Sequence, residues 1–202
     1  MAACLVGVAR YRRLDVPQRY LTWLSLLALL VTVLSLGLAY DKRPNLFLAP
    51  IDTAIEFTLL ALMYRHTLQP SAVARYLPAG IALFLLGSAV FSFRPRLDTA
   101  EFSPVQHVVE SVAVLAFVFL FFRHELTRSL PTTPLERKPM FWVSAGLLLY
   151  FSGSMLIFLS SNAILHLSVE MSRRLWAIHA LLYTFLNAFY VVALSIAPKP
   201  RP

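Results

Sequence analysis

The sequence predicts an all-α protein, a polytopic bundle of transmembrane helices, and three observations support that prediction. Hydrophobic residues make up 58% of the 202 residues, charged residues only 14%, and the mean hydropathy is +0.69. A soluble domain is usually about a quarter charged. The apolar residues form runs of about 20, the length that a helix needs to cross a hydrocarbon core. Tyrosine and tryptophan stand at the borders of these runs, where amphipathic rings prefer to lie in a membrane.

Six runs are long enough to span a bilayer, and their borders place them in order along the chain. The first lies between Tyr20 and Tyr40, the second ends at Tyr64 and the third begins at Tyr76. The fourth begins with Pro104, and proline suits the first position of a helix. The fifth and sixth each carry a tryptophan near their start. We therefore predict full spans at residues 20–40, 46–64, 76–93, 104–122, 140–161 and 175–197.

The two ends of the chain complete one transmembrane domain, because no linker-like stretch divides residues 1–202. Residues 1–19 form a basic segment that we expect in the cytoplasm, and residues 198–202 form a short tail. Residues 1–9 are apolar but too short to span, so they are either a loose tail or the remnant of a further helix. The stretch from Gly37 to Ala39 also permits signal-peptide cleavage, but the apolar run before it is long for a signal peptide.

The net charge of +8 comes from clusters of Lys and Arg between the apolar runs. Twelve of the 18 basic residues fall on the side of the N-terminus, which predicts that both termini are cytoplasmic. The partner that such clusters fit is a lipid bilayer with anionic headgroups, and we expect no nucleic-acid partner. Cys4, the only cysteine, permits neither an intrachain disulfide nor a thiolate metal site.

Ionisable side chains inside the predicted spans are the candidate functional residues, because a charged group at a helix centre costs about 2.5 kcal/mol or more. The topology places five of them in the outer half of the membrane, while the inner half, apart from its border, looks almost entirely apolar. Since carboxylates do not face lipid, we expect these groups to converge on a polar pocket that opens to the outer side. With polar neighbours on the last span, the predicted pocket residues are Asp52, Glu56, His107, Glu110, His179, Tyr183 and Asn187.

Three interpretations of this cluster remain open. In the first, the side chains form hydrogen bonds that hold the helices together. In the second, they bind a ligand in a sensory pocket. In the third, His107, Glu110 and His179 bind a divalent metal ion. No HExxH, CxxC or GxSxG motif supports an enzyme. The sequence therefore leans against an enzyme without deciding the question. We expect no cofactor, with a divalent metal as the alternative.

Two pairs of glycines have the spacing of a helix-packing face. Gly80 and Gly87 lie seven residues apart, and so do Gly146 and Gly153. Each pair places two small residues on one side of a helix, which predicts a close approach of a neighbouring helix there.

The stretch Pro139-Met140-Phe141-Trp142, followed by Gly146 and Leu149-Tyr150-Phe151-Ser152-Gly153, resembles a P-x-F-W…G-x-L-x-Y-F-S-G signature. That signature is found in uncharacterised multi-pass inner-membrane proteins of Gram-negative bacteria. Three further elements are similar to theirs: Ile55-Glu56-Phe57, Val109-Glu110 and Arg12-Arg13-Leu14-Asp15-Val16-Pro17. The resemblance implies a location in the cell inner membrane and a fold of six to seven helices, in which residues 1–9 are a truncated first helix. Similar modules sometimes precede histidine-kinase domains, which implies sensing and a signalling partner protein.

We therefore expect a small sensory, receptor-like membrane module whose ligand binds in the outward-facing pocket. A metal-dependent intramembrane hydrolase is one alternative, with the metal activating water. A small proton-coupled transporter is the other, since intramembrane carboxylates also serve as proton relays.

Overall fold

A computed structural model describes residues 2–43, 45, 47–92, 104–127, 134–165 and 169–196. Every regular element in these residues is a helix, so the all-α prediction is confirmed for them. The elements are α1 (Ala2–Arg10), η1 (Tyr11–Arg13), α2 (Val16–Tyr40), α3 (Leu48–Thr67), α4 (Ala72–Ser92), α5 (Pro104–Thr127), η2 (Leu135–Arg137), α6 (Pro139–Leu165) and α7 (Val169–Ser195). Leu46, Phe93 and Ala197, at the edges of three predicted spans, and the predicted tail 198–202 lie outside the described residues.

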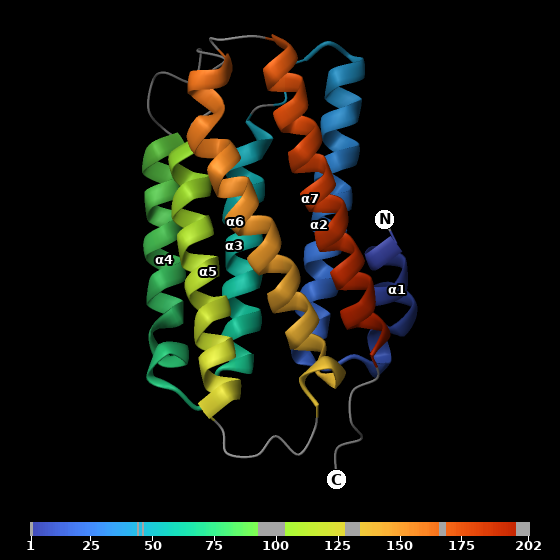
Figure 1. Ribbon diagram of the computed structural model, residues 1–202, viewed down its shortest axis with the longest axis vertical. Coiled ribbons are helices and arrows are strands. Elements are labelled where there is room, and N and C mark those ends of the chain that lie inside the picture. The colour runs from blue at the N-terminus through green and yellow to red at the C-terminus, as the bar shows by residue number, and fades with distance from the viewer. Residues whose placement is uncertain are drawn as a thin grey trace.

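The long helices α2 to α7 run alternately up and down in one bundle (Figure 1). Helices α2, α3, α5, α6 and α7 form a closed ring in which each helix contacts the next, and α7 returns to α2. Helix α4 lies outside this ring against α3, and the short α1 lies against α2 and α7. We call the end where α2 begins and α7 ends the basic end, because more of the Lys and Arg residues gather there.

Five of the six predicted spans are confirmed as helices that are long and apolar enough to cross a membrane, namely α2, α4, α5, α6 and α7. Helix α3 matches the remaining predicted span in position but is not among them. It carries Asp52, Glu56 and three threonines, and it packs against α2, α4 and α5. A helix enclosed by neighbours exposes fewer side chains to lipid and can carry more polar residues. The prediction of six spans is therefore confirmed for five helices only.

Helices α2 and α7 are joined at the basic end through Gln18. The Asp15 side chain accepts a hydrogen bond from the Gln18 backbone at 3.0 Å and caps α2, while the Gln18 side chain accepts from the Asp15 backbone. The same Gln18 amide donates to the carbonyls of Ala193 at 2.7 Å and Ile196 at 3.1 Å. These carbonyls lie at the end of α7, where backbone acceptors have no partner within the helix. One buried side chain thus satisfies two helix ends and closes the ring.

Helices α6 and α7 form the most extensive helix pair, and the glycines of α6 make this contact possible. A Cβ placed on Gly146 would lie 2.8 Å from the Cβ of Phe189, and one placed on Gly153 would lie 2.6 Å from Cδ1 of Leu182. The prediction that Gly146 and Gly153 form a close packing face is therefore confirmed.

Within the described part of this chain, the glycines of α4 do not form such a packing face. A Cβ placed on Gly80 or Gly87 would meet no atom within 4 Å. Both glycines border a groove between α4 and α5 instead of a neighbouring helix. The spacing is the same as in α6, but α4 lies outside the ring, and so no helix covers this face.

Several helices extend beyond the apolar runs that predicted them. Helix α7 begins at Val169, six residues before the predicted start at 175. Its first turns are polar and carry ion pairs within the helix, with Glu170 lying 3.1 Å from Arg174 and 3.9 Å from Arg173. Such pairs at spacings of three and four support a helix outside a membrane without any apolar requirement.

We predict that Gly146→Ala destabilises the bundle by about 1–3 kcal/mol, because the new methyl group would overlap the Phe189 Cβ, which cannot move independently of the α7 backbone. Gly87→Ala is the matched control. It has open space for the methyl group and should leave stability unchanged or raise it by up to about 1 kcal/mol through helix propensity. The measurement is the thermal unfolding midpoint in detergent, and equal midpoints for both variants would contradict the close α6–α7 contact.

Candidate functional site

A cavity of about 570 Å³ lies inside the ring, and residues of all five ring helices line it. Ligand pockets commonly have volumes of about 300–1,000 Å³. The structure brings all the predicted pocket residues to this one cavity, from α3, α5 and α7: Asp52, Glu56, His107, Glu110, His179, Tyr183 and Asn187. Their role in binding a ligand stays a prediction, but their convergence gives that prediction a defined site.

The two histidines of the cavity each form hydrogen bonds between helices. His107 of α5 lies 3.3 Å from the Thr53 hydroxyl of α3, measured from Nδ1. The Thr53 hydroxyl donates to the Ala49 carbonyl at 2.9 Å and so can accept from the imidazole. His179 of α7 lies 3.2 Å from the Tyr150 hydroxyl of α6, measured from Nε2. The structural interpretation, hydrogen bonds that hold helices together, therefore describes the histidines well.

Glu110 differs from the histidines, because half of its carboxyl group has no partner. Its Oε2 lies 3.5 Å from His107 Nδ1, but its Oε1 has no hydrogen-bond partner among the described residues, although the residue is only 1% exposed. Ser154 Oγ and Tyr190 Oη, in residues 0% and 4% exposed, lack partners in the same way. All three residues line the cavity. Buried polar groups are nearly always hydrogen-bonded, and leaving one unpaired costs about 1–3 kcal/mol. Three such atoms therefore lie on residues that line one cavity.

The cavity extends past the middle of the bundle towards the basic end. Its lining runs from Asp52, near the start of α3, to Ser25 of α2 and Tyr190 of α7, which lie in the half nearer the basic end. Beyond it, the buried hydroxyls of Tyr64 and Ser144 are 2.8 Å apart.

The half of the bundle near the termini, which we expect to be almost entirely apolar apart from its border, carries further buried hydroxyls. Thr22 and Ser25 are buried there and donate to the carbonyls of Gln18 and Leu21 on the same helix, both at 3.0 Å. Hydroxyls that bond to the preceding turn of their own helix are inexpensive in lipid and do not interrupt an apolar run. A search of the sequence for charged residues therefore does not detect them.

The alternative metal site is not assembled in this structure. His107 and Glu110 are neighbours, but His179 forms its hydrogen bond with Tyr150. In the part of the chain that the structure describes, no three His, Cys, Asp or Glu side chains lie close enough together to hold a metal ion.

Tyr150 and Ser154 belong to the cavity but were not among the predicted residues. They lie one turn apart on α6, and the Tyr150 ring contacts those of His179 and Tyr183, with centroids 5.6 and 5.9 Å apart. The signal that could have identified Tyr150 is its position near the middle of a 27-residue helix, because tyrosines in membrane helices favour the two interfaces.

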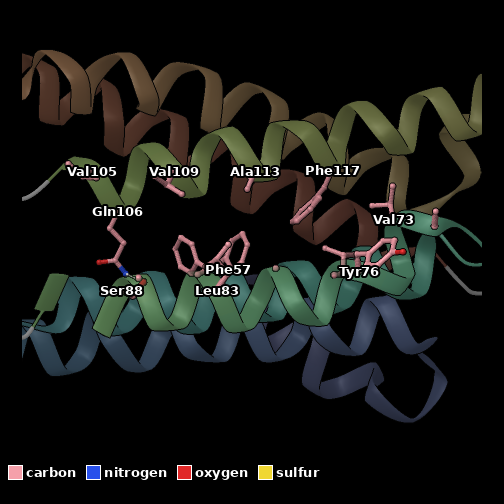
Figure 2. A pocket seen from close by; sticks show the side chains of 15 residues that line it. Phe57, Val73, Tyr76, Leu83, Ser88, Val105, Gln106, Val109, Ala113 and Phe117 are labelled. Carbon is pink, nitrogen blue, oxygen red and sulfur yellow. Dashed lines mark hydrogen bonds between the residues drawn. The ribbon is translucent and has the colours of Figure 1, made fainter. Parts of the chain in front are cut away.

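A second hollow, of about 630 Å³, has a different character (Figure 2). It lies between α4 and α5, and Figure 2 shows Phe57 and Phe117 beside it. The Gln106 amide spans it near the end opposite the basic end and donates to the Ser88 hydroxyl at 3.1 Å. Because the lining is otherwise almost entirely apolar, this groove suits the hydrocarbon environment of a membrane and does not explain the buried carboxylates.

Comparison with known protein families, curated proteins and solved structures finds no match to this chain. The fold defines a protein whose described residues form helices, five of them long and apolar enough to cross a membrane, with a polar cavity among the helices.

We predict that Glu110→Met changes the thermal stability of the purified protein by no more than about 1 kcal/mol, because the gain from removing Oε1, which has no partner among the described residues, offsets the loss of the Oε2 contact with His107. Glu125→Met is the control. The Glu125 carboxylate pairs with Lys138, and its loss should lower stability because it leaves a partly buried cation unpaired. The unfolding midpoint in detergent is the measurement. A large loss of stability in Glu110→Met would show that Glu110 holds the helices together and would favour the purely structural interpretation.

Proposed function

We propose that this chain is a small receptor-like membrane module that binds a ligand in the cavity among its ring helices. The observation that carries this proposal is a set of three buried polar atoms that have no hydrogen-bond partner among the described residues, on three residues, Glu110, Ser154 and Tyr190, that line one cavity of ligand size. A purely structural polar core satisfies its own hydrogen bonds, as both histidines do here. A binding site instead keeps groups available for its ligand.

The proposal includes a specific placement in the membrane. Helix α3 serves as a sixth span, because its 20 residues reach about 30 Å and it lies antiparallel to α2 and α4. The basic end faces the cytoplasm, in keeping with the positive-inside rule, and both termini lie there. The cavity then opens to the outer side, where Asp52 and His107 lie near the starts of α3 and α5.

The proposed setting is the inner membrane of a bacterium, and the proposed output is a signalling partner protein. Both rest on the resemblance of the stretches at 12–17, 55–57, 109–110 and 139–153 to multi-pass inner-membrane proteins whose relatives precede histidine kinases. The physical support is partial. Pro139 begins α6, Asp15 caps α2, and Gly146 and Gly153 pack closely against α7. Much of the signature therefore has a structural role.

A proton-coupled transporter is the second candidate, and one observation favours it. Ser25 lines the cavity in the half nearer the basic end, and the buried hydroxyls of Tyr64 and Ser144 lie beyond the cavity on the same side. Chains of polar side chains of this kind can conduct protons in membrane proteins. A metal-dependent hydrolase has less support, because His107, Glu110 and His179 do not form a ligand set.

We predict that a cysteine at position 180 is labelled from the outer side of the membrane by an impermeant thiol reagent. Ala180 lines the cavity, whereas its neighbour Leu181 is 55% exposed on α7 and lies outside the lining. In a Cys4→Ser background, Ala180→Cys should react at least about tenfold faster than Leu181→Cys, because the reactive thiolate forms in water and not in lipid. Equal rates for the two cysteines would contradict a water-accessible cavity, and labelling of Ala180→Cys from the cytoplasmic side alone would contradict the orientation.

The same labelling separates a receptor from a transporter. Ser25 lines the cavity in the half nearer the basic end. A receptor with a one-sided cavity predicts that Ser25→Cys is protected from reagent applied to the cytoplasmic side. A transporter alternates its access and exposes this position to the cytoplasmic reagent in a fraction of molecules. The measurement compares labelling in inside-out and right-side-out vesicles, and cytoplasmic labelling of Ser25→Cys would favour the transporter.

A further inference from the structure

The charges of the cavity are unbalanced. Among the described residues, its lining contains three carboxylic residues, Asp52, Glu56 and Glu110, and two histidines, but neither Lys nor Arg. His107 Nδ1 lies 3.5 Å from Glu110 Oε2, and His179 Nε2 lies 3.2 Å from the Tyr150 hydroxyl, so both histidines already bond to side chains of this chain. Carboxylates enclosed by helices favour the approach of an opposite charge.

The atoms without partners define what the ligand must offer. An ionised carboxylate can only accept hydrogen bonds, and the hydroxyls of Ser154 and Tyr190 can accept as well as donate. A ligand that binds the ionised Glu110 carboxylate at Oε1 must therefore bring a donor, and an N–H carried by a cation makes the strongest such bond.

The walls of the cavity suit the organic part of such a ligand. Aromatic rings surround His179, with the Trp176 and Tyr150 centroids each 5.6 Å from its ring, and Tyr183 packs on Tyr150 at 5.9 Å. Trp and Tyr faces attract organic cations through their π electrons and also pack against apolar groups.

We propose that the cavity binds an organic ammonium ion, an amine with at least one N–H and an apolar or aromatic body. Its ammonium group donates to Glu110 Oε1 and neighbouring oxygens, and its body lies against the rings of Tyr150, Trp176 and Tyr183. This inference rests on the proposed function, since it names the ligand class of the same cavity.

The experiment compares four probes that share one aromatic ring: benzylammonium, benzyltrimethylammonium, benzyl alcohol and benzoate. Each is added to the full chain in lipid nanodiscs, and two quantities are measured, the labelling rate of Ala180→Cys and the unfolding midpoint of the wild-type protein. Benzylammonium should slow the labelling and raise the midpoint, because a ligand that binds the folded state stabilises it. Benzyltrimethylammonium, which has the charge without the N–H, should act at higher concentration, and the alcohol and benzoate should have no effect.

Two variants test the assignment of the carboxylates. Glu110→Gln and Glu56→Gln should each raise the half-maximal benzylammonium concentration by at least about tenfold, because each removes a charge-assisted partner. Glu170→Gln is the matched control, since Glu170 is an exposed carboxylate of α7 outside the cavity, and it should respond like the wild type.

Equal effects of benzylammonium and benzyl alcohol, a stronger effect of benzoate, or no effect of any probe on either quantity would overturn the cation assignment. In each of these cases, labelling of Ala180→Cys from the outer side would still support the cavity, so the two proposals fail separately. If labelling of Ala180→Cys is absent, the midpoint measurement still decides whether benzylammonium binds.

Discussion

The structure depends on one constraint, that polar and charged side chains on membrane helices must turn away from lipid. Five helices close a ring, and the polar faces of α3, α5 and α7 turn to its interior. The ring closes through two contacts of different kinds. Gly146 and Gly153 let α6 and α7 approach closely, and Gln18 ties the start of α2 to the carbonyls that end α7. The cavity exists because the ring helices surround more space than their own side chains fill.

The polar residues that line the cavity divide into two groups, those whose polar atoms have hydrogen-bond partners and those with a polar atom that lacks one. His107 and His179 bridge helices through Thr53 and Tyr150, and this is the bonding expected of a structural polar core. The carboxyl group of Glu110 and the hydroxyls of Ser154 and Tyr190 retain atoms without partners despite their burial. Natural proteins tolerate such a cost mainly where function requires it. This contrast, more than the presence of acidic residues, is the reason to regard the cavity as a binding site.

The sequence predicts the helices and the polar cluster because both follow from local chemistry. Long apolar runs locate the helices, and the cost of a charge in lipid singles out Glu56 and Glu110. The sequence does not predict features that depend on which helices pack against each other. Gly80 and Gly87 have the same spacing as Gly146 and Gly153. Among the described residues, however, only Gly146 and Gly153 pack closely against a neighbouring helix. Ser154 and Tyr190 resemble many other hydroxyl residues in the chain, and only the closure of the ring shows that they share a cavity with Glu110.

The central claim is that Glu110, Ser154 and Tyr190, whose buried oxygens have no partner among the described residues, line a cavity that something other than this chain fills. A crystal structure in a lipid mesophase, at a resolution that shows ordered water, tests it most directly. The account predicts density inside the ring within hydrogen-bonding distance of Glu110 Oε1, from water or a bound molecule. A collapsed interior, in which these three side chains bond to one another, would contradict it.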